Sequence, residues 1–355
     1  AGYDIGNSLR FYPGTPDYLS DWDMGTTATS TKIGTISVWC KISGYSEGDA
    51  NTDGNTIISH KTDTTNYIYF RHKDYADTGQ LQVYGKLSDS VNINLITTPV
   101  FRDPSAWYHF VLAWDTTQGT DTNRMKLYVN GVQITVFSTA TYPAEDAVIR
   151  FSDPVERNIG RRVSSSSSGY NYYSGYMADF NLVDGLALTP SNFGETDSDS
   201  GIWKPKAPNV SEYGAAGMRL EFKETGTDED SASSVGADTS GKGNHTSPLG
   251  SLTADSVVVD TPTNNFCTLN NLGTGLTTSS ASVADESLSE GNTGLTGYDG
   301  SSKVESTMGV ANGKWYVEYK LTDVQNAQMG ITANVAKDDG HLGGSVYDYS
   351  YITSN

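Results

Sequence analysis

Short stretches in which apolar and polar residues alternate recur from residue 8 to residue 185, and they constrain the fold more than any other feature. A period of two residues is typical of a β-strand with one buried face. Gly, Asn, Asp, Ser and Thr, which favour turns, separate these stretches. No stretch carries apolar residues at helical spacing over several turns. The pattern therefore predicts an all-β protein, an antiparallel β-sandwich of two sheets.

The clearest hairpin is "LYVNGVQI", residues 127–134. Asn130 and Gly131 join two alternating runs, and both tolerate the positive φ angles that a two-residue type I′ turn requires. In another run, Cys40 falls on the apolar face, where we expect it to act as a small buried hydrophobic residue. The expected strands cover residues 8–12, 17–19, 35–43, 55–61, 66–72, 80–87, 107–115, 124–130, 132–137, 158–160 and 175–185.

The pattern changes near residue 190, which suggests a domain boundary. Thr189-Pro190 predicts one short helical turn. We expect a first domain at residues 1–200 and a connector rich in Gly, Ser, Thr and Asp at 201–302, extended except for a short strand near 218–222. Strand patterns resume at 303–355, where we expect an incomplete second β-sandwich.

Charge and composition exclude some classes of partner. The chain has 355 residues and a formal net charge of −19, whereas a nucleic-acid-binding surface must be basic. No apolar run approaches the roughly 20 residues that cross a bilayer. The two cysteines, Cys40 and Cys267, have no zinc-site spacing and form no disulfide framework. We therefore expect neither a nucleic-acid partner nor membrane insertion.

One long stretch carries a family resemblance. "WYHFVLAWDTTQGTDTNRMKLYVNGVQI" (107–134) resembles the laminin G-like, concanavalin A-like jelly roll, whose hallmarks are a Trp-x-His strand and a strand ending Tyr-Val-Asn-Gly. The stretch 172–196 resembles the last strand and short helix of that family. The resemblance covers about residues 5–200 and implies the jelly-roll form of the β-sandwich.

Four further segments together are similar to a group of phage virion proteins, many from phages of marine bacteria. They are "SLRFYPGTPDYLS" (8–20), residues 97–117, residues 184–206 and "VVVDTPTNNFCTLN" (257–270). In that group a linker joins the jelly roll to a SPRY-like β-sandwich, and residues 312–332 are similar to its first two strands. Too few residues follow for a complete SPRY domain, so we expect the chain to be a fragment of a longer protein.

The virion resemblance implies a location and partners. It places the protein on the exterior of a phage particle, as a tail-fibre, receptor-binding or capsid-associated component. Its partners would be other virion proteins and host surface polysaccharide. Because weak binding to single sites becomes useful when many copies act together, we expect a homo-oligomer, a trimer if the protein is a fibre.

The loop "SSSSSGYNYYSGY" (164–176) is the predicted carbohydrate-binding site. Tyr170, Tyr172 and Tyr173 offer flat apolar faces with polar tips, and Asn171 can bind sugar hydroxyls. The alternative is a loop whose tyrosines lie along the entry to the next strand. A second aromatic group is explained more simply by strand alternation; it contains Tyr67, Tyr69, Tyr75 and Tyr84.

Two acidic loops are candidate calcium sites, although no cofactor is required. "GDANTDGN" (48–55) matches the first half of an EF-hand loop, but His60 stands where the bidentate glutamate belongs. The alternative is an acidic hairpin turn. The candidate ligands are Asp49, Asn51 and Asp53 in this loop and Asp115 and Asp121 in a second loop.

Catalytic patterns are weak, so we expect no enzyme. Glucan hydrolases of the concanavalin A-like fold carry Glu-x-Asp-x-x-Glu on a strand, and their carboxylates act as nucleophile and acid. Here Glu195 and Asp197 fit, but Ser200 replaces the second glutamate and we expect the segment to be a loop. His109 is predicted to be structural. A purely structural decoration protein, a polysaccharide depolymerase and a secreted lectin remain alternatives.

Overall fold

The computed structural model describes most of the chain, which divides into two units, residues 1–266 and 267–355. In unit 1 the described residues are 2–12, 16–21, 27–43, 55–73, 79–87, 90–153, 156–163 and 171–266. In unit 2 they are 267–270, 288–295, 304–321, 328–332 and 348–352. Within the described residues, no helix is long and apolar enough to cross a membrane.

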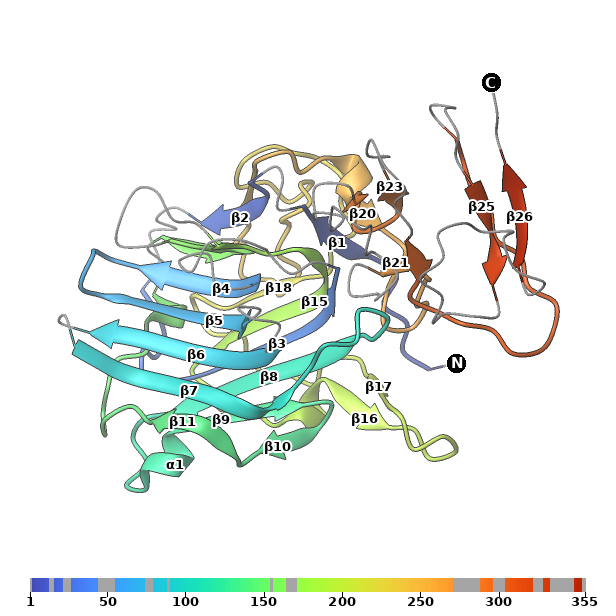
Figure 1. Cartoon of the computed structure of the whole chain (residues 1–355). Helices are drawn as coiled ribbons and strands as arrows, with labels where there is room; N and C mark the ends of the chain where they lie inside the picture. The colour runs from blue at the N-terminus through green and yellow to red at the C-terminus, as the bar shows by residue number, and fades with distance from the viewer. Residues whose placement is uncertain are drawn as a thin grey trace. The chain divides into compact units, whose positions relative to one another are not determined.

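Unit 1 is built on two eight-stranded antiparallel sheets, named here sheet A and sheet B (Figure 1). Sheet A has the spatial order β10 (Val132–Ile134), β9 (Met125–Val129), β8 (Tyr108–Asp115), β3 (Ile33–Ile42), β15 (Gly175–Asp184), β1 (Ser8–Phe11) and β20 (Val257–Val258), with β18 (Met218–Leu220) also paired to β15. Sheet B has the order β11 (Phe137–Thr141), β7 (Ser90–Val100), β6 (Gln80–Leu87), β5 (Tyr67–Lys73), β4 (Asn55–Lys61), β12 (Arg157–Ile159), β2 (Tyr18–Asp21) and β19 (Ser247–Leu249).

Shorter elements complete unit 1. Two small ribbons pair β13 (Arg161–Arg162) with β14 (Asn171–Tyr172) and β16 (Gly194–Thr196) with β17 (Trp203–Pro205). The helical pieces are α1 (Asp121–Arg124) and the 3₁₀ turns η2 (Arg150–Ser152), η3 (Pro190–Asn192) and η4 (Ala254–Ser256). The helical turn predicted at Thr189-Pro190 is confirmed as η3, whose N-cap Thr189 forms a capping box with Asn192.

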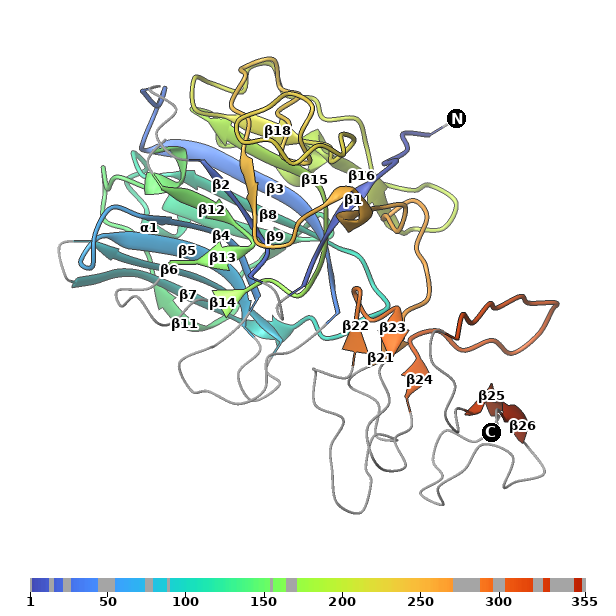
Figure 2. The ribbon, with the colours of Figure 1, turned by 90° about the horizontal axis from the view of Figure 1, so that it is seen from above.

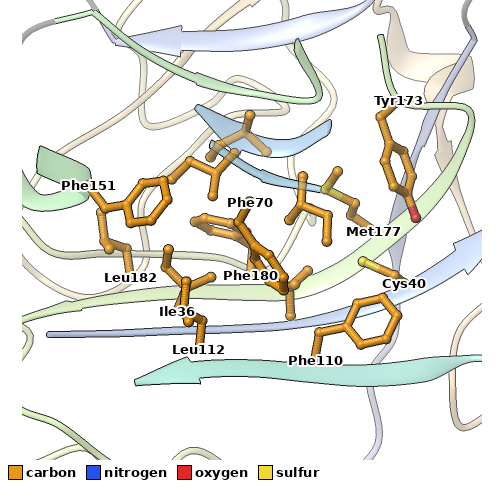
Figure 3. Close-up of a cluster of buried hydrophobic side chains, with 14 of the residues drawn as sticks. Ile36, Cys40, Phe70, Phe110, Leu112, Phe151, Tyr173, Met177, Phe180 and Leu182 are labelled. Carbon is orange, nitrogen blue, oxygen red and sulfur yellow. The ribbon is translucent and has the colours of Figure 1, made fainter. Parts of the chain in front are cut away.

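The core lies between the two sheets, where alternate residues of each strand meet (Figure 3). Ile36 and Cys40 of β3 face Phe70 of β5 within one buried cluster that also includes Phe180 of β15. The alternation that predicted the strands thus produces the buried face. The predicted antiparallel jelly-roll sandwich is confirmed, and Cys40 is buried as expected.

The predicted hairpin at Asn130-Gly131 is also confirmed. Both residues have positive φ, 47° and 82°, and Val129 pairs with Val132 across the turn. A Cβ at Gly131 would lie 2.6 Å from the Trp203 ring, so the position needs glycine for space as well as for φ. The turn therefore brings β17 against the hairpin.

One long strand was missed by the sequence analysis, and others are shifted. β7 (Ser90–Val100) pairs with both β6 and β11, although its run "SVNINLITTPV" contains Pro99 near its end. The run 132–137 is two strands, because β10 ends at Ile134 and the chain then crosses to sheet B as β11. A period of two residues identifies a strand but does not identify the sheet that it joins.

The segment after residue 200 lies against the sandwich, whereas the sequence predicted an extended connector from 201 to 302. The expected strand near 218–222 is present as β18, and β19 and β20 also pair with the sandwich. In Figure 2 the yellow part of this segment lies along β15 and β3, on the side away from β5 and β6. The structure divides the chain after Phe266, not near residue 200.

Buried polar contacts hold this segment, which explains why its composition concealed its order. The Lys41 ammonium group on β3 donates to Asp260 Oδ2 at 2.8 Å, and Trp107 Nε1 donates to Asp260 Oδ1 at 3.0 Å. The Lys41 side chain is fully buried. Arg157 donates to the Ala216 carbonyl oxygen at 2.8 Å. Ion pairs and hydrogen bonds hold this segment in place, so its sequence shows no apolar pattern from which its order could be predicted.

Unit 2 contains only short pairings in the part of the chain that the structure describes. They are β21 (Leu269–Asn270) with β24 (Glu305–Ser306), β22 (Leu288–Ser289) with β23 (Gly294–Leu295), and β25 (Gln328–Thr332) with β26 (Asp348–Ile352). Residues 314–321 lie in the stretch that resembles the first two SPRY strands, but they have no regular structure, and Trp315 is 71% exposed.

Candidate functional site

Three tyrosines form a stack on the face of sheet B that points away from the core. Tyr67 and Tyr69 are two residues apart on β5, so they share a face, and Tyr84 on β6 is the register partner of Tyr69. The ring centroids of Tyr69 and Tyr84 are 5.2 Å apart, and those of Tyr67 and Tyr84 are 6.0 Å apart. Tyr67 and Tyr84 are half-buried, so the stack is accessible at these two rings.

Two arginines lie against this stack. The guanidinium carbons of Arg71 and Arg162 lie 5.0 Å and 5.3 Å from the centroid of the Tyr69 ring. Arg71 Nε donates to Gln82 Oε1 at 2.8 Å, and Gln82 Nε2 donates to Asn94 Oδ1 at 2.8 Å. Cation–π contacts of this kind contribute about 0.5–2 kcal/mol each, depending on burial. The result is a fixed face with aromatic, cationic and amide groups, which we call the tyrosine–arginine face.

The ribbon β13–β14 adds a second aromatic–cation contact. The Arg161 guanidinium carbon lies 3.8 Å from the centroid of the Tyr18 ring, and the Tyr18 and Tyr172 rings are 6.3 Å apart. Arg161 and Tyr172 are register partners, as are Arg162 and Asn171. The ribbon is fixed to sheet B because Ser59 Oγ donates to the Arg161 carbonyl oxygen at 2.6 Å. Residues from β2, β5 and the ribbon therefore meet here.

The pKa of the Tyr84 phenol is shifted by burial and by the groups that lie near it. Burial raises the pKa of Tyr84, and Tyr67 raises it further, while the cations Lys86 and Arg162 act in the opposite direction. The phenol therefore stays protonated at neutral pH, and it can donate a hydrogen bond as well as accept one. Lys86 and Arg162 place positive charge beside the accessible rings.

The structure separates the residues of the predicted carbohydrate-binding loop. Tyr170 lies outside the described residues, and Tyr172 packs near Tyr18. Tyr173 is fully buried in the core cluster, where its ring meets Phe11 edge-on and offers no face to a ligand (Figure 3). Asn171 is 2% exposed, and neither atom of its side-chain amide has a hydrogen-bond partner.

The predicted calcium ligands are not brought together among the described residues. Asp49, Asn51 and Asp53 lie outside them. Although desolvation alone would raise it, hydrogen bonds from Thr117 and Gln118 hold the pKa of Asp115 below its usual range. The Asp121 carboxylate accepts a hydrogen bond from its neighbour's backbone. In the described part of the chain, no three His, Cys, Asp or Glu side chains form a group that could hold a metal ion.

The two candidate catalytic carboxylates share one cation. Glu195 lies on strand β16, which corrects the prediction of a loop, and it pairs in register with Lys204 of β17. The Lys204 ammonium nitrogen lies 2.8 Å from Asp197 Oδ2 and 3.6 Å from Glu195 Oε1. Hydrogen bonds from Lys204 and Ser200 hold the pKa of Asp197 far below its usual range. A general acid needs the opposite shift, so Asp197 is not suited to act as the protonated acid.

His109 is packed as a structural residue. Its ring stacks on Trp39 with centroids 4.7 Å apart, and burial lowers its pKa to about 3. Trp203 Nε1 donates to His109 Nδ1 at 3.0 Å, so the ring proton resides on Nε2, which donates to Ser37 Oγ at 2.8 Å. Both ring nitrogens are used within the protein.

One part of the tyrosine–arginine face could be predicted from the sequence, and another part could not. Tyr67, Tyr69 and Arg71 occupy every second position of one strand, so they had to share a face. What the strand could not show is that Arg161 and Arg162, far away in the sequence, join the same face. Their contribution depends on the sheet order, in which β12 lies beside β4.

Comparison with known proteins agrees with the fold. The family model described as "Concanavalin A-like lectin/glucanases superfamily" matches residues 15–192. No curated protein matches the sequence. Among solved structures, a heptameric SAP-like pentraxin from Limulus polyphemus is 18% identical, covering 53% of this chain and 80% of that one, with a TM-score of 0.35.

Two further structures are similar to the chain. The CBM40 of the Ruminococcus gnavus IT-sialidase, bound to α2,3-sialyllactose, is 14% identical over 42% of this chain and 75% of that one, with a TM-score of 0.28. The extracellular region of zebrafish Gpr126/Adgrg6 is 14% identical over 56% of this chain and 25% of that one, with a TM-score of 0.31. On the family match over residues 15–192, the chain belongs to the concanavalin A-like lectin/glucanases superfamily.

Proposed function

We propose that this chain is a non-enzymatic carbohydrate-binding protein on the exterior of a phage particle, where it contacts host surface glycans. The observation that carries the binding part is the stack of Tyr67, Tyr69 and Tyr84 on adjacent strands. Tyr67 and Tyr84, the half-buried rings of the stack, present apolar surface for the C–H groups of a sugar, and their phenol groups can bind its hydroxyls. Because strands hold the rings, little side-chain entropy is lost on binding.

The non-enzymatic part is supported by the state of the candidate carboxylates. Lys204 lies between Glu195 and Asp197, and both carboxylates are on a ribbon separate from sheets A and B. A glycoside hydrolase needs one protonated and one ionised carboxyl group on either side of the scissile bond. The salt bridge and hydrogen bonds that hold the pKa of Asp197 far below its usual range do not suit it to the protonated role.

The virion part is supported by the four sequence segments that are similar to phage virion proteins. In this proposal residues 303–355 begin a SPRY-like domain, and the exposed apolar side chains of Trp315 and Tyr316 await partners in such a sandwich. Other virion proteins and further copies of the chain are its proposed partners. An oligomer, a trimer in a fibre, would combine weak sites into useful avidity.

Tyrosine substitutions test the binding proposal. We expect Tyr84→Ala to weaken binding to glycans selected on an array by about three- to tenfold, since one aromatic contact contributes about 0.5–1.5 kcal/mol. Tyr128→Ala on β9 of sheet A removes the same side chain from the other sheet and serves as the control. Isothermal titration measures both. Equal affinity of the two variants and the wild type would contradict a role for the stack.

Metal removal provides an independent test. Binding through aromatic and amide groups needs no cation, so we expect EDTA to leave the glycan affinity unchanged. A loss of affinity that calcium restores would instead assign the site to the acidic loops, with Asp49, Asn51, Asp53, Asp115 and Asp121 as the candidate ligands. The measurement is titration of the selected glycan before and after chelation.

Immunogold labelling of intact particles tests the location. An antibody raised against residues 1–266 should label fibres or the tail tip if the protein recognises the host. Even labelling of the capsid would favour the purely structural decoration protein. Absence of label from every particle would overturn the virion proposal.

A further inference from the structure

The dipeptide Asn-Gly occurs twice in the chain, in two different environments. The first copy is Asn130-Gly131 in the β9–β10 hairpin, and the second is Asn312-Gly313 in unit 2. Asparagine is a thermolabile residue, because the peptide nitrogen that follows it can attack the carbon of its side-chain amide. A following glycine leaves that nitrogen unshielded, since glycine has no Cβ. The surroundings of each pair therefore decide whether this reaction proceeds.

The hairpin fixes the side chain of Asn130. Its Oδ1 accepts a hydrogen bond from the His109 backbone N–H at 2.8 Å, and its own backbone N–H donates to the His109 carbonyl oxygen at 2.9 Å. Strands β9 and β10 pair on both sides of the turn, and Gly131 packs against the Trp203 ring. The Asn130 amide carbon can reach the Gly131 nitrogen only if the hairpin opens locally, which costs free energy.

Asn312 has none of these restraints. Asn312 and Gly313 are both exposed, and they lie in a bend between elements, where Gly313 has a φ of 106°. Among the described residues, neither the Asn312 side chain nor the Gly313 N–H group has a hydrogen-bond partner. The side chain can therefore rotate toward the Gly313 nitrogen without breaking a hydrogen bond or a strand pairing.

Trp315 makes the Gly313 nitrogen easier to activate. Its Nε1 donates a hydrogen bond to the Asn312 carbonyl oxygen at 2.7 Å. This oxygen belongs to the same peptide group as the Gly313 nitrogen, which attacks after it loses its proton. The negative charge of the resulting anion is shared with the oxygen, so a hydrogen-bond donor at the oxygen stabilises the anion. Trp315 thus acts on the reaction through the peptide group and does not touch the carbon that is attacked.

We propose that Asn312-Gly313 is a site of spontaneous modification, at which the Gly313 nitrogen attacks the side-chain amide carbon of Asn312. A C–N bond forms and closes a succinimide ring, while the side-chain nitrogen leaves as ammonia and takes the proton of the Gly313 nitrogen. Water then opens the ring at either carbonyl group, which gives aspartate or isoaspartate. Either product places a new carboxylate directly before the exposed side chains of Trp315 and Tyr316.

Peptide mapping of the full chain over time tests the proposal. After incubation at neutral pH, trypsin releases peptides 304–314 and 127–150, which contain Asn312 and Asn130, and mass spectrometry measures the modified fraction of each. We expect modification at Asn312 to be about tenfold faster or more, because Asn130 reacts only after local opening. Gly313→Ala should slow it about tenfold, since a Cβ shields the nitrogen. Trp315→Phe should slow it about threefold, the effect of one hydrogen bond.

The product and the pH dependence identify the mechanism. Succinimide formation gives isoaspartate together with aspartate, and its rate should rise with pH because the nitrogen must lose a proton. Aspartate alone at position 312 would indicate direct hydrolysis and overturn the proposal. Equal rates at Asn312 and Asn130, or an unchanged rate in Gly313→Ala, would overturn it as well, and an unchanged rate in Trp315→Phe would overturn the activation by Trp315. The Asn130 peptide in each digest is the control, because its slow reaction shows that a variant keeps the hairpin.

Discussion

Two buried histidines show how burial alone sets the chemistry of a residue. His109 and His72 are fully enclosed, and burial lowers their pKa values to about 3 and about 4. Burial therefore keeps both rings neutral in the folded state at neutral pH, and His72 Nε2 donates to the Phe101 carbonyl oxygen at 2.7 Å. A histidine in the sequence of this fold is therefore not evidence of a proton-transfer site.

This neutrality predicts a loss of stability in acid. An unfolded histidine titrates near 6.5, so between pH 6.5 and pH 4 the unfolded chain binds protons that the folded chain does not. The contribution of each histidine is complete above about pH 6.5 and falls as the pH drops, by about 2–3 kcal/mol at pH 4.5. We expect His109→Gln to lose less stability than the wild type between pH 7 and pH 4.5.

Urea unfolding at the two pH values provides the measurement. His245→Gln serves as the control, because this histidine is not enclosed. The same pH dependence in the wild type and the His109 variant would contradict the prediction.

Among the elements, β20 and the residues after it are the least expected. This short strand pairs with β1, and Asp260 just beyond it accepts hydrogen bonds from Lys41 and from Trp107. The Lys41 ammonium group also donates to Asn265 and to the carbonyl oxygen of Phe266. The buried ammonium group of Lys41 on β3 thus binds polar groups between residues 260 and 266 and fixes this segment.

A double-mutant cycle tests the coupling between Lys41 and Asp260. We expect Asp260→Asn to cost about 3–5 kcal/mol, because it leaves the buried ammonium group without its counter-charge. Lys41→Met should cost a similar amount. The double variant should cost less than the sum, because no unpaired charge remains. The free energy of unfolding in urea measures all three variants, and additive costs would show that the two groups do not interact.

At the scale of the whole molecule, the sandwich is completed by residues far beyond its last long strand. The outward side chains of β3, including Trp39 and Lys41, are buried although they lie on the outside of sheet A. Asp184 at the end of β15 accepts hydrogen bonds from the backbone of Thr29 and of Ala216, so a segment before β3 and a segment after residue 200 are bound to the same carboxylate. A protein truncated near residue 200 would expose these outward side chains of β3 to solvent.

Truncation tests this completion. We expect residues 1–266 to unfold in one cooperative transition, whereas residues 1–200 should aggregate or melt at a much lower temperature. Scanning calorimetry and size-exclusion chromatography of the two proteins provide the measurement. Equal melting temperatures would show that the covering segment adds nothing to the stability of the sandwich.

Sequence reasoning reached the sandwich, the Asn130-Gly131 hairpin and the turn at Pro190, because local periodicity and turn chemistry fix them. It did not predict that residues 201–266 are ordered, because polar groups such as Asp260 stabilise that segment only when their partners are present. It also chose Tyr173 as a surface residue, since alternation gives a period and not the side that is buried. The tyrosine–arginine face needed the sheet order, which no local pattern contains.

The pairing of β1 with β20 has a mechanical consequence for a protein tethered at both ends. Ser8 lies opposite Val258, so tension that arrives through the residues before Ser8 and after Val258 pulls on the same end of an antiparallel pair. Such a pair opens one hydrogen bond at a time and resists little force. Asp260, however, is fixed to Lys41 outside that end of the pair. The ion pair between Lys41 and Asp260 therefore bears the tension before the β1–β20 pair does, and it prevents these two strands from separating.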